Sequence, residues 1–381
     1  MRKLLYLLIL SLSITGCKKP YNPPAIAMAG SYLVVEGVVN AGPDSTIITL
    51  SKTVNVSSAN NVNPVLGAAV SVVSDQGIAY PLTEAGNGSY VSPGLNLDKT
   101  HQYRLSIKAP NNEQYQSDLV PVNITPPIDS LGFNVVNNAA PGVQIYANTH
   151  DATNTIKYFR WDYNETWEFH AHYFSCYVGN GSALVLRSAS QQINLCFGNE
   201  VSSDIVLGSA AKLQQDVLYQ SPIAFISSTS EKIETEYSML LREYALTADA
   251  YNFWVNLKTN SESLGSIFDA QPSQVTGNIH CISNPSEPVI GYVSVCTVTS
   301  KRIFITSQQL PGWTPTYPYS CGQDSALSCC TPFLYPPGST VIATGPPPLL
   351  GNGVPGKVAT SDRECADCTL RGSTTRPPFW H

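Results

Sequence analysis

The feature that most constrains the fold is a run of alternating apolar and polar residues over positions 159–173. A period of two is typical of a β-strand with one buried face and one wet face. Glu165 is the one polar residue in the apolar row, so we predict a long antiparallel strand with a bend or bulge near Glu165. The apolar row consists of Phe159, Trp161, Tyr163, Trp167, Phe169, Ala171 and Tyr173.

Shorter strand-like runs fill the segments on both sides of this strand. Between residues 31 and 127 they are separated by turn sequences such as Gly86-Asn87-Gly88, a spacing typical of a β-sandwich of immunoglobulin-like or transthyretin-like size. Pro126 and Pro127 mark the end of this domain. A second β-rich domain is expected over residues 128–310. The remaining runs are at residues 32–40, 46–51, 69–74, 89–91, 103–107, 143–147, 237–246, 275–281, 289–299 and 302–306.

One helix is expected, at residues 248–259. Thr247 offers the N-cap and Asp249 the acidic first turn. The face that we expect to be buried consists of Tyr251, Trp254, Val255 and Lys258.

Residues 311–381 contain 12 of the 28 prolines and five of the ten cysteines, without periodicity. We expect an extended tail clipped covalently to the body. The predicted fold class is therefore all-β: tandem immunoglobulin-like or transthyretin-like sandwiches, one short helix and a Cys/Pro-rich C-terminal tail.

The N-terminus has the layout of a secretory signal. Arg2 and Lys3 precede an apolar core at residues 4–14, which is shorter than the roughly 20 residues of a membrane-spanning helix. Small residues before Cys17 resemble the bacterial lipobox. We expect residues 1–16 to be removed as a signal peptide, Cys17 to be acylated, and residues 17–30 to form a lipidated tether. Lys18 stands where an inner-membrane retention signal carries Asp, which favours the outer membrane.

Charge excludes some classes of partner. Charged residues make up 13% of the chain, against about 25% in ordinary proteins. Removal of residues 1–16 takes away two basic residues and no acidic one, so the formal net charge goes from −6 to −8. An acidic chain with scattered cations has no electrostatic footprint for nucleic acid. The lipid on Cys17 is the one membrane anchor that we expect.

The cysteines favour structural disulfides, because an exported chain meets an oxidising compartment. We expect the tail cysteines to pair mostly among themselves, and Cys176 to pair with Cys196. The alternatives are a zinc site built from Cys365, Cys368 and Cys321 with Cys329 or Cys330, and a redox-active Cys365–Cys368 pair. Since the count is odd, at least one thiol stays unpaired. The candidates are Cys176, Cys196, Cys281, Cys296, Cys321, Cys329, Cys330, Cys365 and Cys368.

One further cluster is a candidate metal site. Glu168, His170 and His172 alternate along the long strand, so their side chains would share one face and could chelate zinc or copper. The interpretation that we favour is a solvated strand face.

The tail tyrosines Tyr317, Tyr319 and Tyr335 either pack the tail onto the body, which we favour, or contact a ligand. No catalytic motif occurs, and neither an enzyme nor a cofactor is expected.

Several segments together resemble a family of unknown function, the domain-of-unknown-function family 4249 of Bacteroidota outer-membrane lipoproteins. The resemblance implies encoding beside TonB-dependent receptors, and it supplies no catalytic or ligand-binding residues. Lys18 and Lys19 depart from the acidic surface-export signal of these bacteria, so the periplasmic and the surface face both stay open. The segments are residues 33–40, 48–53, 67–70, 103–107, 237–257, 265–272, 277–278, 365–372 and 378–380.

We therefore expect a non-enzymatic outer-membrane lipoprotein that is an accessory or docking subunit of a TonB-dependent receptor or another outer-membrane assembly. One alternative is a lipoprotein that captures a glycan, peptide or chelate. The other is a metal carrier or enzyme that uses Glu168, His170 and His172.

Overall fold

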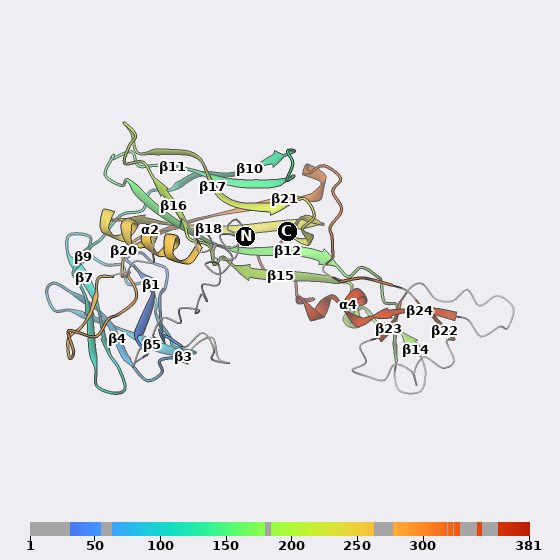
Figure 1. Ribbon diagram of the computed structural model, residues 1–381, viewed down its shortest axis with the longest axis horizontal. Helices are drawn as coiled ribbons and strands as arrows, with labels where there is room; N and C mark the ends of the chain where they lie inside the picture. Colours follow the sequence, from blue (N-terminus) through green and yellow to red (C-terminus); the bar gives the residue numbers. More distant parts are fainter. Residues whose placement is uncertain are drawn as a thin grey trace, which may run out of the picture.

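The computed structural model describes residues 31–54, 63–179, 184–262, 277–317, 319–322, 324–327, 341–344 and 357–381. The chain is mostly β-structure, as predicted, and forms two bodies and an arm (Figure 1). We call the bodies the half-barrel (β1–β9, β19 and β20) and the sandwich (β10–β12, β15–β18 and β21). The arm consists of β13, β14, β22–β24 and α4.

The half-barrel is a single sheet that curls around its own core. Its strand order is β19-β8-β7-β4-β5-β6-β2-β1-β20, with β3 beside β2 and β9 beside β7. Leu50, Val72 and Leu105 are fully buried inside it. Its strands are β1 (Leu33–Asn40), β2 (Thr46–Lys52), β3 (Asn63–Pro64), β4 (Ala69–Ser74), β5 (Ala79–Gly86), β6 (Ser89–Ser92), β7 (Gln102–Lys108), β8 (Gln114–Ser117), β9 (Val120–Pro121), β19 (Ile279–Cys281) and β20 (Val295–Cys296).

Strands β19 and β20 belong to a different body from the one that the sequence predicts. Residues 275–281 and 289–299 were assigned to the second domain, but β19 pairs with β8 and β20 pairs with β1. Both strands therefore complete the N-terminal body across a long stretch of chain. Local sequence shows that a strand forms but not which edge it joins, because pairing partners are set by tertiary packing.

Asn278 ties the two ends of the curled sheet together. Its buried side chain donates to the carbonyl oxygen of Val293 (3.0 Å) and accepts from the Val293 amide (2.8 Å). Beside it, a Cβ atom on Gly277 would lie 1.6 Å from the carbonyl oxygen of Gly291, so glycine is required at this close approach.

We expect Asn278→Ala to lower the free energy of unfolding by about 2 kcal/mol, because it leaves a buried backbone amide and carbonyl unpaired. Urea denaturation measures the change. Asn252→Ala on the exposed face of helix α2 (Ala248–Glu262) is the control and should change stability by less than about 0.5 kcal/mol. Equal stability of the two variants would contradict the role of Asn278.

The sandwich consists of two sheets packed face to face. The sheet β10-β11-β17 covers the sheet β15-β12-β18-β21, in which β16 also pairs with β12. Figure 1 shows the two sheets as separate layers. The strands are β10 (Ile128–Val136), β11 (Gly142–His150), β12 (Tyr158–His170), β15 (Leu195–Val201), β16 (Val206–Ser209), β17 (Val217–Ser227), β18 (Glu236–Leu246) and β21 (Val298–Thr306).

Strand β12 is the predicted long strand, and its apolar row is buried as expected. Phe159 and Phe169 are fully buried, Trp161 is 1% exposed and Trp167 is 9% exposed. The strand ends at His170, so Tyr173 lies beyond it. The predicted bulge at Glu165 is wrong, because the pairing with β18 keeps a regular register. Glu165 is buried without distortion since Tyr237 and Lys232 satisfy its carboxylate.

A second buried carboxyl group, Glu243 on β18, joins the two sheets. It is fully buried and accepts hydrogen bonds from Trp161 Nε1 (2.8 Å) on β12 and from Thr149 Oγ1 (2.9 Å) on β11. Burial raises the pKa of Glu243 to about 7, although the two hydrogen bonds act in the opposite direction and nearby Asp129 adds to the rise. No local pattern in the sequence predicts the burial of Glu243.

The pKa of the Glu243 carboxyl group is higher in the folded protein than in the unfolded chain. The stabilisation that protonated Glu243 provides is therefore complete at acidic pH and is lost as the pH rises through about 7. Glu243→Gln keeps a donor and an acceptor at this position and removes the titration. We expect the stability of the variant relative to wild type to increase by up to about 3 kcal/mol between pH 5 and pH 9, as measured by urea denaturation. A relative stability that is independent of pH would contradict this assignment.

Helix α2 (Ala248–Glu262) forms where predicted, and Thr247 caps it through a hydrogen bond from the amide of Ala250. The predicted buried face is partly wrong. Val255 is exposed, and Ala250 and Phe253 are buried instead. This face joins a third apolar cluster that includes Tyr244 of the sandwich and Cys296 of the half-barrel, so the cluster fixes the two bodies against each other. Of the helices in the described ranges, none has the length and apolar character needed to cross a membrane.

The arm projects from the end of the sandwich, and the chain then returns to it (Figure 1). Ser373 pairs with Phe197 of β15, and the Trp380 ring packs against Phe197 and Phe304. The last residues therefore lie on the sandwich. The elements of the arm are β13 (Tyr177–Gly179), β14 (Leu184–Leu186), β22 (Asp324–Leu327), β23 (Val341–Thr344), β24 (Lys357–Asp362) and α4 (Arg363–Ala366).

Candidate functional site

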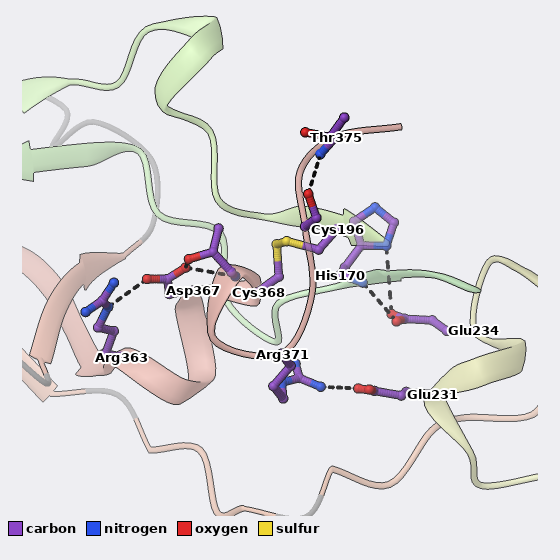
Figure 2. Close-up of a disulfide and its surroundings, with 11 residues drawn as sticks. His170, Cys196, Glu231, Glu234, Arg363, Asp367, Cys368, Arg371 and Thr375 are labelled. Carbon is purple, nitrogen blue, oxygen red and sulfur yellow. Dashed lines mark hydrogen bonds and ion pairs between the residues drawn. A yellow bond between two sulfur atoms is a disulfide. The ribbon is translucent and has the colours of Figure 1, made fainter. Parts of the chain in front are cut away.

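One disulfide clips the C-terminal tail to the sandwich, and a second joins two cysteines of the tail. Cys196 on β15 is bonded to Cys368, which lies 172 residues further along the chain, and Cys321 is bonded to Cys365 (Figure 2 shows the first). Of the three tail cysteines among the described residues, Cys321 and Cys365 pair with each other as expected, but Cys368 pairs outside the tail.

The predicted Cys176–Cys196 bond is wrong, because Cys196 is paired with Cys368 inside the sandwich core and Cys176 is free. The zinc and redox alternatives are also contradicted, since Cys365 and Cys368 belong to different disulfides. Cys281 and Cys296 are buried free thiols. Cys329 and Cys330 lie outside the described residues, as does Cys17.

Ion pairs and ring contacts reinforce this clip. Asp367 is buried and pairs with Arg363 (2.7 Å), and Arg371 pairs with Glu231 of the sandwich (Figure 2). The Arg371 guanidinium also lies 4.7 Å from the centre of the Phe169 ring. A covalent bond, partly buried ion pairs and a cation–π contact thus hold the same short segment.

We expect the double substitution Cys196→Ala and Cys368→Ala to lower the free energy of unfolding by about 2–4 kcal/mol, because the bond closes a very long loop. Guanidinium denaturation under non-reducing conditions measures this loss, and limited proteolysis should show faster cleavage in residues 369–381. Cys176→Ala removes a free thiol and is the matched control. A double variant as stable and as resistant to proteolysis as this control would contradict the assignment.

The candidate metal ligands do not come together. His170 is the last residue of β12, and its Nδ1 lies 3.4 Å from Thr235 Oγ1. His172 lies beyond the strand, with its ring edge-on to Tyr317. Glu168 stays in the strand, in register with Glu236. Among the residues that the structure describes, no group of three His, Cys, Asp or Glu side chains could hold a metal ion.

The tail tyrosines pack against the sandwich. Tyr317 donates to Glu234 (3.4 Å), and the Tyr319 ring lies next to Tyr317 and to the Arg371 guanidinium. This is the packing role that we favoured for Tyr317 and Tyr319. Tyr335 lies outside the described residues.

A polar cleft of about 380 Å³ opens at one side of the sandwich. Lys232 bridges the carboxylates of Glu165 and Glu200, at 2.6 Å from each. Burial acts to lower the pKa of Lys232, but the hydrogen bonds that Lys232 donates to the two carboxylates outweigh it, and the net pKa is raised. The Lys232 cation is therefore already paired with two carboxylates, and this group of three side chains keeps one negative charge in excess.

A larger cleft, of about 740 Å³, lies between the half-barrel and the sandwich; we call it the inter-body cleft. One wall is the β1–β2 hairpin, and the other is the polar face of β12, β18 and β21 with Val201 of β15. Its size is that of a small-molecule site, and boundaries between domains commonly hold such sites.

On the sandwich wall, two guanidinium groups share one carboxylate. Asp162 accepts from Arg242 Nε (2.6 Å) and from Arg160 Nη2 (3.3 Å). The Arg160 guanidinium lies 4.2 Å from the Trp254 ring centre and 5.1 Å from that of Tyr244, so aromatic rings fix its position. This wall therefore keeps one positive charge in excess.

On the half-barrel wall, Glu36 and Asp44 are exposed carboxylates. Neither makes an ion pair with any residue in the described part of the chain. No motif in the sequence predicts that the five charged groups of this cleft form a site. Arg160 and Asp162 were visible as polar positions of the alternating strand, but no local signal shows that β18 and β1 bring the other three to them.

The fold and the clefts define a mostly-β protein built of a curled half-barrel and a sandwich. The chain belongs to the family described as Domain of unknown function (DUF4249), which matches residues 18–302. The matched region covers both bodies and ends within β21, before the Cys/Pro-rich tail. The resemblance seen in the sequence is thereby confirmed at the level of the family. Comparison with curated proteins gave no match.

Proposed function

We propose that the protein is a non-enzymatic outer-membrane lipoprotein, acylated at Cys17, that is an accessory or docking subunit of a TonB-dependent receptor or another outer-membrane assembly. The observation that carries the proposal is the signal-like segment ending at Cys17, next to a chain that belongs to the DUF4249 family. Two disulfides support export, because such bonds persist in oxidising compartments.

The architecture supports a docking role. Two bodies held at a fixed angle by a shared apolar cluster offer a large, rigid surface, and their loops lie outside the cores. For the sandwich we further propose an immunoglobulin-like or transthyretin-like relationship, supported by its two facing antiparallel sheets. Comparison of its strand order with an experimentally solved member of either fold tests that relationship.

Affinity purification of the acylated protein from detergent-solubilised outer membranes tests the function. We expect a receptor or an assembly subunit in stoichiometric amount, identified by mass spectrometry. The matched control is Cys17→Ser, which should carry no acyl mass, leave the membrane fraction and lose the partner.

A protein that keeps residues 1–16, or that carries no acyl group, would contradict the membrane placement. Recovery of no partner together with stoichiometric zinc would contradict the docking role and favour a metal carrier. Substitution of His170 and His172 by Ala should leave partner recovery unchanged.

A second candidate function, capture of a small ligand, is favoured by one specific observation. The inter-body cleft combines a ligand-sized volume with guanidinium and carboxylate groups on opposite walls. A protein that passes substrate to a transporter needs such a site, whereas a pure docking subunit does not.

A further inference from the structure

We propose that the inter-body cleft binds a short peptide with free termini. Its carboxylate would lie at Arg160 and Arg242, its amino group at Glu36 and Asp44, and an apolar side chain between Ile47 and Val201. This inference goes beyond the docking role and does not depend on it, because it concerns only groups within this chain.

The cleft does not need a ligand to form. Two of the segments that connect the bodies are bonded to each other. The Thr125 amide donates to Thr297 Oγ1 (2.9 Å), and the Thr297 amide donates to the carbonyl oxygen of Asn123 (3.0 Å). The apolar cluster around Cys296 and Tyr244 adds a third connection. Since both walls are held in place, binding costs little reorganisation.

The sandwich wall is built to receive an anion. Asp162 neutralises only one of the two guanidinium groups, and the rings of Trp254 and Tyr244 restrict Arg160. A guanidinium with its orientation fixed in advance can bind a carboxylate through paired hydrogen bonds with less loss of side-chain entropy.

The opposite wall is built to receive a cation. Glu36 and Asp44 line the cleft as carboxylates without a basic partner in the described ranges. A ligand that carries both charges therefore satisfies both walls, whereas a simple anion or a simple cation satisfies only one.

The apolar lining favours a peptide over a sugar. Ile47 and Val201 are large side chains that are 53% and 59% exposed, and both line the cleft, one on each wall. A sugar is usually held by an exposed aromatic face, but the ring of Tyr244 is 7% exposed and lies beside Arg160. Branched aliphatic surfaces instead match the side chains of residues such as leucine.

The test is isothermal titration calorimetry of the full acylated protein in detergent with a leucine tripeptide that has free termini. We expect saturable binding of one peptide per chain. Amidation of its carboxyl end or acetylation of its amino end should each weaken binding by at least about tenfold, since each removes a charge-assisted contact.

Matched variants assign each end of the peptide to its wall. In the Arg160→Met variant, amidation of the peptide should not weaken binding any further. In the double variant Glu36→Gln and Asp44→Asn, acetylation of the peptide should not weaken binding any further. Both acidic residues are exposed, so this double variant does not threaten the fold. Ile47→Ser should weaken binding, whereas Ile78→Ser, at a residue of similar exposure (56%) outside the cleft, should not.

Failure of the free peptide to bind overturns the proposal, and so does binding that is insensitive to blocked termini or to every cleft substitution. These outcomes are separate from the docking role, because partner recovery from membranes is measured without the peptide. Peptide binding with no partner recovered would contradict docking and leave the cleft assignment supported.

Discussion

The pairing of β12 with β18 is the interaction on which the rest of the structure depends. The two strands remain in register from Tyr158 to Glu168, and each contributes one face to the sandwich core and the other to a wall of the inter-body cleft. A shift of one residue would exchange these faces, placing charged side chains in the core. The buried carboxyl groups Glu165 and Glu243 add specificity, because each finds hydrogen-bond partners only in this register.

The tail is held by a different kind of interaction. It has little periodic apolar sequence, yet its last residues lie on the sandwich through the Cys196–Cys368 bond, the Arg371–Glu231 pair and the Trp380 ring. Covalent and electrostatic contacts here replace the burial of a continuous apolar face. A segment of this composition is unable to fold by itself, and the disulfide gives it a fixed place at the end of β12.

Local patterns predicted the elements well and their partners poorly. The alternation from Phe159 to Phe169 and the cap at Thr247 are encoded by neighbouring residues, and both are present in the structure. Cys368 finds Cys196 across 172 residues, a choice that no spacing rule contains. Likewise, Glu243 stands in a run that looks like an ordinary strand, and only the arrival of Thr149 from another sheet explains its burial.

The half-barrel is assembled from two pieces of sequence separated by most of the sandwich. Strands β19 and β20 join β8 and β1 only after residues 128–262 have been made. Pairings of such long sequence separation form slowly, because the intervening chain must be ordered first. During synthesis, the first nine strands would therefore wait with both edges of their sheet open, and such edges are sites of aggregation. The order in which the polypeptide emerges thus makes the N-terminal body the last to be finished, and a chaperone would have its greatest effect on that body.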